Sequence, residues 1–193
     1  MINKICLLLI ACLLPLGVFA KNLKIDNSNS VWLDTEVNAA SVDKAIQKID
    51  SLCKDKFRIY LIINTNGGSI DEGMRLIKHM EYASCKVDTV AIKAISMGFT
   101  IHQMGEKRYM VKNGTLMQHH PLTYLEGFYN PNDLEQIYDE LLKVYVETLK
   151  LFAPRSGHTV EEMAKLIGAI HWWKAIDAVK DRLVDDVVTL NGK

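Results

Sequence analysis

The stretch RIYLIINTNGGS at residues 58–69 decides the fold class of this chain. Its first six residues are nearly all apolar, which is typical of a strand buried on both faces of a parallel sheet. Gly67 and Gly68 then break the strand, and apolar residues recur at helical spacing from Ile70 to Met80. A strand, a glycine turn and an amphipathic helix in that order predict an α/β protein with a mainly parallel sheet.

The segments on either side repeat the same alternation. A short strand over 31–33 precedes a helix that is expected to start at Ser41, and a further strand is expected over 87–92. A turn at Ser96 then leads into a short helix that runs through Gln103. Strands that alternate with helices in this way are joined by right-handed crossovers.

The last third of the chain is less regular. Two strands, over 107–111 and 116–118, are expected to pair around the turn formed by Asn113 and Gly114. A long helix, capped by Asn132 or Asp133, is predicted to end at Phe152 before Pro154 and Gly157. A capping box at residues 159–162 opens another helix, and the segment 183–188 is predicted to be the last strand.

Residues 1–20 have the composition of a secretory signal peptide. Lys4 is their one charge, and an apolar run from Ile5 to Ala20 follows it and ends in small residues. We expect cleavage after Ala20, which makes the protein secreted or periplasmic and leaves one domain over 21–193. Two alternatives remain open, an uncleaved membrane anchor and lipidation at Cys12.

Composition limits the partners and the redox state. The 193 residues carry 23 basic and 23 acidic side chains, so loss of Lys4 with the leader leaves a net charge of −1. A nucleic acid partner, which requires a basic face, is therefore not expected. Cys53 and Cys85 remain in the mature chain, and export allows a disulfide between them. Two buried free thiols are the equally open alternative.

Three short segments together offer the parts of an acyl-transfer site. Ser96 follows a buried strand and starts a helix, where unpaired N–H groups favour a developing oxyanion. The N–H groups of Met97 and Gly68 are the candidate donors, and His119 is the candidate base. His120 is its neighbour and points the opposite way if the segment is extended. No metal or cofactor is expected.

Each of these features alone has a simpler explanation. A serine at a helix start is usually a cap, a Gly-Gly pair after a strand is usually a turn, and an isolated histidine is usually structural. Their order and spacing along one chain favour the catalytic interpretation.

The joint pattern resembles the proteolytic subunit of the Clp protease family. NTNGGS at residues 64–69 resembles the family's NSPGGS turn, and AISMG at 94–98 resembles AASMG around its nucleophile. MQHHP at 117–121 resembles MIHQP around its base, and AIDAVKDRLVD at 175–185 resembles APEAVEYGLVD near its end. The similarity runs from about Val31 to Val188.

This resemblance implies a crotonase-like fold of stacked ββα units, with a mainly parallel sheet and a projecting handle helix. It implies Ser96 as nucleophile, His119 as base, and Gly68 and Met97 as oxyanion donors. It also implies a homo-oligomer of heptameric rings, in which two rings meet face to face through the helix 132–152, and a peptide or unfolded protein as substrate.

The chain departs from the family at the third catalytic position. The family's aspartate aligns with Leu166, and residues 166–170 are all uncharged. Glu162, one helical turn earlier, is a possible substitute acid. An acid from elsewhere or a serine–histidine dyad is the second explanation, and a weak or inactive enzyme is the third. His171 is near but cannot replace the charge of a carboxylate.

The sequence therefore predicts an exported serine peptidase of Clp type that forms an acyl-enzyme on Ser96. Family members usually work in the cytosol with an ATP-driven unfoldase, and an exported copy would meet neither. We expect no ATPase partner, and small or already unfolded peptides as substrates. The alternative is an inactive scaffold or binding ring that lacks the triad acid. An acyl-CoA enzyme, or a serine–lysine dyad using Lys93 or Lys112, is less compatible with the histidine motif.

Overall fold

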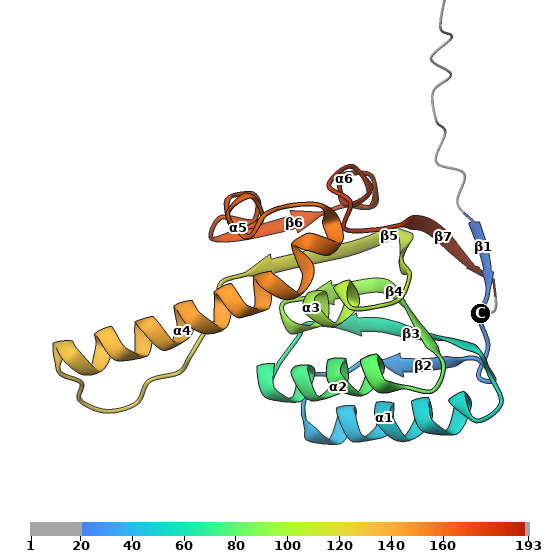
Figure 1. Ribbon diagram of the computed structural model, residues 1–193, viewed down its shortest axis with the longest axis horizontal. Coiled ribbons are helices and arrows are strands. Elements are labelled where there is room, and N and C mark those ends of the chain that lie inside the picture. Colours follow the sequence, from blue (N-terminus) through green and yellow to red (C-terminus); the bar gives the residue numbers. More distant parts are fainter. Residues whose placement is uncertain (1–20, 192–193) are drawn as a thin grey trace, which may run out of the picture.

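The computed structural model describes residues 21–191, and the predicted leader at residues 1–20 lies outside them. One sheet contains all the described strands, in the order β1-β7-β5-β4-β3-β2 (Figure 1). All neighbours along this order are parallel, and β6 alone pairs antiparallel, with β5. The predicted α/β class with a mainly parallel sheet is therefore confirmed.

The strands are β1 (Lys21–Lys24), β2 (Ser30–Leu33), β3 (Arg58–Thr65), β4 (Lys86–Ile95), β5 (Arg108–His119), β6 (Ile170–Trp173) and β7 (Asp186–Asn191). The helices are α1 (Ala39–Cys53), α2 (Ile70–Tyr82), α3 (Met97–Gln103), α4 (Pro131–Phe152), the 3-10 turn η1 (Pro154–Ser156), α5 (Val160–Ile167) and α6 (Ala175–Lys180). No helix between residues 21 and 191 is both long enough and apolar enough to cross a membrane.

The core lies mainly on one face of the sheet. Helices α1, α2 and α3 lie side by side there (Figure 1), and Ile59, Leu61 and Ile63 of β3 point into this core. Ile62 points to the other face and joins a smaller cluster with Val90. Because β3 is covered on both faces, its near-continuous apolar sequence is explained by its position inside the sheet.

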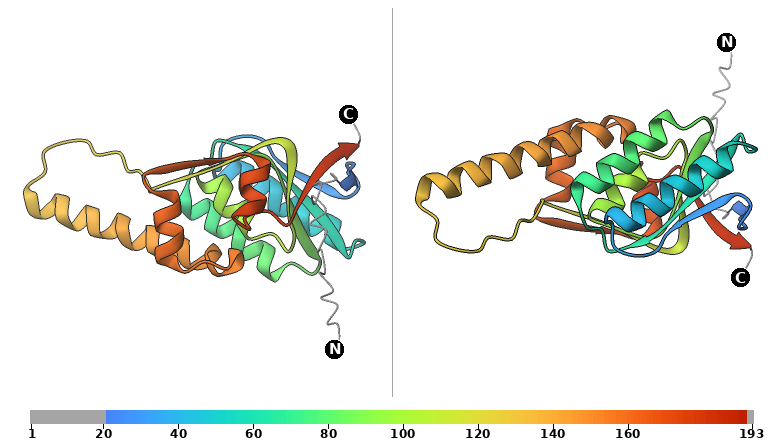
Figure 2. Two further views of the ribbon diagram at one scale, coloured as in Figure 1. Left: turned by 90° about the horizontal axis from the view of Figure 1, so that it is seen from above. Right: turned by 90° about the horizontal axis from the view of Figure 1, so that it is seen from below.

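Helix α4 projects away from the rest of the molecule. Both views in Figure 2 show it extending with the segment that precedes it, and only its last turns return to the core. Tyr145, Leu149 and Phe152 are buried, whereas large apolar side chains nearer the tip are exposed. A projecting helix was predicted from the resemblance, and the structure contains one.

Several predicted boundaries move because of local caps. Helix α1 starts at Ala39, because the side chain of Asn38 accepts the Ser41 N–H and caps it earlier than expected. Asn130 caps α4, so the predicted cap at Asn132 or Asp133 is wrong; Pro131 is accepted at the first helical position, where its missing N–H costs nothing. The capping box at Thr159 is confirmed. The last strand begins at Asp186, later than predicted.

The predicted strand pair around Asn113 and Gly114 is wrong. Residues 108–119 form one continuous strand, β5, both halves of which run parallel to β4. Met110 pairs with Ala91 and Thr115 with Lys93, so the intervening residues bulge out of the ladder. The residues Asn113 and Gly114, which are typical of a turn, mark this bulge. They do not reverse the chain, because the strand pairs in parallel with β4 both before and after them.

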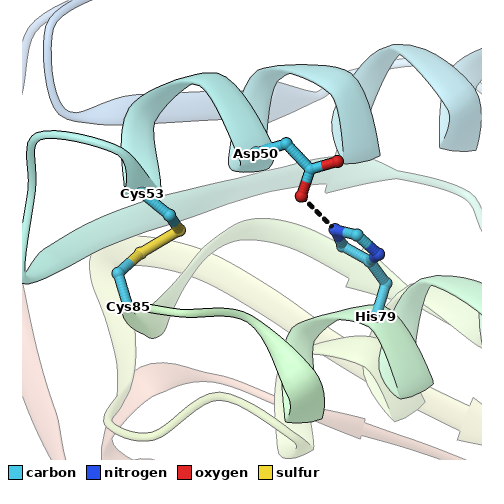
Figure 3. The surroundings of a disulfide bond; sticks show 4 residues. All are labelled: Asp50, Cys53, His79 and Cys85. Carbon is cyan, nitrogen blue, oxygen red and sulfur yellow. Dashed lines mark hydrogen bonds and ion pairs between the residues drawn. A yellow bond between two sulfur atoms is a disulfide. The ribbon is translucent and has the colours of Figure 1, made fainter.

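A disulfide joins Cys53 to Cys85, with an S–S distance of 2.15 Å (Figure 3). It links the end of α1 to the residue before β4, and thus settles the choice that the sequence left open. Beside it, His79 of α2 contacts Asp50 of α1 at 2.8 Å. The two helices are therefore tied together by a covalent bond and by a hydrogen bond between side chains at the surface.

Candidate active site

Ser96 occupies the sharp turn between β4 and α3. Its backbone has φ 55° and ψ −121°, a conformation that non-glycine residues adopt rarely and at a cost. The Ser96 N–H donates to the Met117 carbonyl at 2.9 Å, which fixes the turn against β5. Its hydroxyl makes no capping hydrogen bond to α3. The simpler explanation of this serine as a helix cap is therefore wrong.

Gly67 lets the neighbouring turn approach Ser96 closely. A Cβ at Gly67 would lie 2.7 Å from the Ile95 carbonyl oxygen and 2.8 Å from the Ser96 Cβ. Its φ of 96° is also one that side chains disfavour. Only glycine fits here, so the Gly-Gly pair shapes the backbone around Ser96 in addition to forming a turn.

Gly68 lies in a short parallel bridge with Val37. The Val37 N–H donates to the Gly67 carbonyl and the Ser69 N–H donates to the Val37 carbonyl, each at 2.8 Å. The Gly68 N–H takes no part in this bridge. Gly68 borders a neighbouring hollow that Lys93 also lines, and not the cavity beside Ser96.

Met97 is the first residue of α3, and its N–H belongs to the first turn, where helical donors have no partner within the helix. Its buried side chain packs against Gly73, where an added Cβ would lie 2.3 Å from the Met97 Cγ. This contact holds the start of α3 against α2. The backbone N–H beside Ser96 therefore has a fixed position, as an oxyanion donor requires.

His119 is the last residue of β5, two residues after the partner of Ile95 in the ladder. It lines a cavity of about 30 Å³ together with Ser96 and Met97. The structure thus brings the predicted nucleophile and base to one small space. No hydrogen bond joins their side chains in the described part of the chain, and neither Lys93 nor Lys112 lines this cavity.

The His119 ring is oriented by a backbone group. Its Nδ1 lies against the carbonyl oxygen of His120, and only a protonated Nδ1 can donate to that oxygen. This contact leaves Nε2 as the acceptor, which is the tautomer that a general base requires. A carbonyl can fix the tautomer, but it carries no full charge to stabilise an imidazolium.

The two positions considered for a third catalytic residue have other roles in the structure. Leu166 is partly buried and packs against the main core. Glu162 is exposed, and its carboxylate accepts the Thr159 N–H at 2.8 Å in the capping box of α5. Within residues 21–191, no carboxylate is hydrogen-bonded to His119. The role of Glu162 as substitute acid stays a prediction.

Tyr145 of α4 is a cavity residue that the sequence motifs did not single out. Its ring stacks on His120, with centroids 4.2 Å apart. It lines the cavity with Ser96 and His119, and its buried hydroxyl has no hydrogen-bond partner. Its polar tip, at a position of α4 that is followed by Thr148 on the same face, was the signal that could have identified it.

A buried polar network at the other end of α3 was also missed. The His102 Nε2 lies 2.9 Å from the Tyr109 carbonyl, and its Nδ1 lies 3.0 Å from the Gln103 amide nitrogen. The Arg108 guanidinium donates to Gln103 and pairs with Asp185 at 2.7 Å. Burial, partly offset by the bond to Tyr109, lowers the pKa of His102 to about 4. The ring is therefore neutral at physiological pH and holds α3 to β5.

Chemically, the site combines a serine hydroxyl free of any cap hydrogen bond, a helix N-terminus and an oriented imidazole around one small cavity. No group of His, Cys, Asp or Glu within the described residues could hold a metal ion. This is the arrangement of a serine hydrolase of the acyl-transfer type.

Comparison with known proteins agrees with this class. The family model described as Clp protease matches residues 19–191. The chain is 31% identical over 164 residues to the ATP-dependent Clp protease proteolytic subunit 2 of Tropheryma whipplei (strain Twist), covering 82% of this chain and 90% of that protein. It is 29% identical over 136 residues to the ATP-dependent Clp protease proteolytic subunit of Streptococcus mutans serotype c, covering 69% of each.

The chain therefore belongs to the Clp protease family, and it is a serine peptidase of that family. Its α/β fold with a mostly parallel sheet is consistent with the crotonase-like fold implied by the sequence motifs.

Proposed function

We propose that this protein is an exported peptidase that cleaves small or already unfolded peptides through an acyl-enzyme on Ser96, without an ATP-driven partner. The observation that carries the chemical part is the shared cavity: Ser96, in a strained turn with an uncommitted hydroxyl, lines the same space as an oriented His119.

In this mechanism the Ser96 hydroxyl attacks the carbonyl carbon of the peptide bond, and its proton passes to Nε2 of His119. The N–H groups of Met97 and Gly68 stabilise the oxyanion. His119 then gives the proton to the leaving amine, and the acyl-enzyme remains. Water, deprotonated by the same nitrogen, hydrolyses the ester and frees Ser96.

The support for export comes from two independent features. Residues 1–20 have the pattern of a signal peptide, and Cys53 and Cys85 form a disulfide, which persists in an oxidising compartment. Outside the cytosol the protein meets no ATP, which is the reason for proposing an activity independent of an unfoldase. The relatives compared above are named as ATP-dependent subunits, so this is a difference in mode of action.

We also propose that copies of this chain associate through α4. Leu134, Tyr138 and Leu142 are exposed on this helix, and Leu122, Tyr124 and Phe128 are exposed on the segment before it. Monomers rarely expose so many large apolar side chains together. The family resemblance makes a second copy the expected occupant. Size-exclusion chromatography with light scattering checks this: Tyr138→Asp combined with Leu142→Asp should reduce the oligomer to smaller species.

A second candidate function is a ring or binding protein without catalysis. The observation that favours it is the bonding around His119, which finds a backbone carbonyl where the family has a carboxylate. In this case the association through α4 would be retained and Ser96 would have no chemical role.

A fluorophosphonate probe separates the two. The mature protein should be labelled at Ser96, Ser96→Ala should lose the label, and Ser51→Ala, which changes an exposed serine of α1, should keep it. Absence of labelling under conditions that label a control serine hydrolase would favour the inactive scaffold. Periplasmic fractionation of the full chain, followed by thiol alkylation with and without reductant, tests export and the disulfide separately.

A further inference from the structure

One residue that lines the cavity beside Ser96 carries a polar group for which the described part of the protein provides no partner. Tyr145 is 6% exposed, and its hydroxyl is buried without a hydrogen bond. Leaving such a group unpaired costs about 1–3 kcal/mol, so an orphan hydroxyl in a native site calls for an explanation.

Apart from the nucleophile Ser96 and the base His119, the other polar side chains that line this cavity have hydrogen-bond partners within the protein. The Gln118 amide donates to the Thr100 hydroxyl at 3.1 Å and its oxygen accepts the His119 N–H at 3.1 Å. The Thr148 hydroxyl donates to the Val144 carbonyl of its own helix at 2.8 Å. Besides the nucleophile Ser96, Tyr145 is thus the neutral lining residue whose hydroxyl has no hydrogen-bond partner in the described part of the chain.

The position of the cavity says which part of a substrate reaches this hydroxyl. Ser96 and Met97 line it, so the cavity adjoins both the attacking oxygen and a candidate oxyanion donor. A peptide carbonyl held between those two groups places the side chain of the same residue, the one before the cleaved bond, in the adjacent space. Ile70 and Met97 give that space apolar walls.

Its size and charge restrict that side chain. A volume of about 30 Å³ holds roughly two water-sized groups, which excludes aromatic and long side chains without rearrangement. No lysine or arginine lines the cavity, so the carboxylate of an acidic substrate side chain would be buried without a counter-charge. A short uncharged side chain with a hydrogen-bond acceptor is the remaining class.

We propose that Tyr145 is a specificity-determining residue of this peptidase, whose hydroxyl donates a hydrogen bond to a short, uncharged polar side chain immediately before the cleaved bond, as in asparagine, serine or threonine. This inference rests on the proposed function, because it requires Ser96 to attack a peptide. The stacking of the Tyr145 ring on His120 holds the hydroxyl in place. Burial also raises the pKa of Tyr145, which keeps it a donor at neutral pH.

The experiment uses three fluorogenic peptides, succinyl-Ala-Ala-X-aminomethylcoumarin with X as Asn, Ala or Leu. The mature protein should have its highest kcat/KM with Asn. Tyr145→Phe keeps the ring and its stacking and removes one oxygen. It should lower kcat/KM for the Asn peptide by about 10- to 100-fold and change that for the Ala peptide less than about twofold. Tyr82→Phe, the same change at an exposed tyrosine of α2, is the matched control.

Each other outcome has a distinct meaning. Equal losses on the Asn and Ala peptides would assign Tyr145 a structural role and overturn this proposal, as would a preference of the mature protein for Leu. Cleavage of none of the three peptides, together with no fluorophosphonate labelling, would remove the proposed function itself. Labelling at Ser96 with cleavage of Leu alone would leave the peptidase standing and reject only the role of Tyr145.

Discussion

The two halves of the candidate site are built in different ways. Ser96 and Met97 belong to a turn that is held between buried segments, with the Gly67 backbone on one side and Met117 on the other. His119 is half-buried at the end of β5, and an exposed segment begins directly after it. The nucleophile half is thus organised by the protein core, whereas the histidine half depends on one backbone carbonyl.

This difference explains which part of the site could change during divergence. The turn at Ser96 cannot relax without moving β4, β5 and the Gly67 backbone, so its geometry persists as long as the sheet does. The support of the histidine comes from outside the sheet, and there Leu166, the position that the sequence motifs match to the family's aspartate, packs against the core. A weaker base beside a well-formed nucleophile is the expected result.

The largest effect should come from removing the base. His119→Asn should lower kcat/KM by about 10²- to 10⁴-fold, because proton transfer by a positioned imidazole contributes a factor of that size. His79→Asn, which changes a surface histidine of α2, is the control and should leave kcat/KM within about twofold. Steady-state peptide hydrolysis measures both. A loss below tenfold for His119→Asn would mean that another group acts as base and that the site does not depend on the histidine.

Gly67→Ala tests whether the nucleophile half of the site is held rigidly by its surroundings. The added Cβ meets the Ile95 carbonyl at 2.7 Å, so the turn beside Ser96 must shift, and kcat should fall by about 10²- to 10³-fold, as when an oxyanion donor is displaced. The melting temperature should fall as well.

Gly127→Ala is the matched control for that variant. Gly127 also has a positive φ, 113°, but an added Cβ there would have nothing within 4 Å. Its substitution should therefore cost only the strain of an alanine at positive φ, about 1 kcal/mol of unfolding free energy, and should leave kcat unchanged. Equal effects of the two substitutions would show that the turn at Gly67 tolerates movement.

The buried His102 of α3, the helix that begins in the nucleophile half, predicts that the stability of the fold falls in acid. The pKa of His102 is lowered from 6.5 to about 4, so the unfolded chain takes up a proton at a higher pH than the folded protein does. Stability from this group is complete above pH 6.5 and is lost as the pH falls toward 4, by about 3 kcal/mol in total.

Denaturant unfolding between pH 7 and 4 measures that loss, and NMR titration of the His102 ring assigns it to the residue. The ring should titrate near pH 4 with the protein still folded. A titration midpoint near pH 6.5 would show that the polar network around α3 is open to water and that the nucleophile half of the site is not rigid.

The smallest effect is expected at the cap of α2. The Ser69 hydroxyl accepts the Glu72 N–H at 3.3 Å, directly after the glycine turn. Ser69→Ala should lower the unfolding free energy by about 1 kcal/mol, while Ser51→Ala on the exposed side of α1 should change it by less than about 0.5 kcal/mol. Chemical denaturation resolves the difference, and a loss of peptidase activity with Ser69→Ala would extend the rigid half to α2.

Much of the fold was predictable because local pattern and tertiary burial agree. The apolar run from 58 to 63 favours a strand through its own composition, and it forms β3 in the structure. Pro154 and Gly157 end α4 by local chemistry alone. The turn at Asn113 and Gly114 was misread, because a hairpin and a bulge share the same residues. Pairing of both halves of β5 with β4 decides between them, and that pairing lies outside any local window.

The sequence by itself determined the alternation of strands and helices between residues 31 and 103, the serine turn, the glycine turn and the histidine motif, since each depends on residues close together in the chain. Only the tertiary structure decided that Cys53 and Cys85 are bonded, that the His119 ring contacts a backbone carbonyl, and that Tyr145 lines the cavity with a buried hydroxyl that has no partner. These facts depend on which distant segments come into contact, and on which hydrogen-bond partners those segments provide. Neither can be predicted from the spacing of residues along the chain.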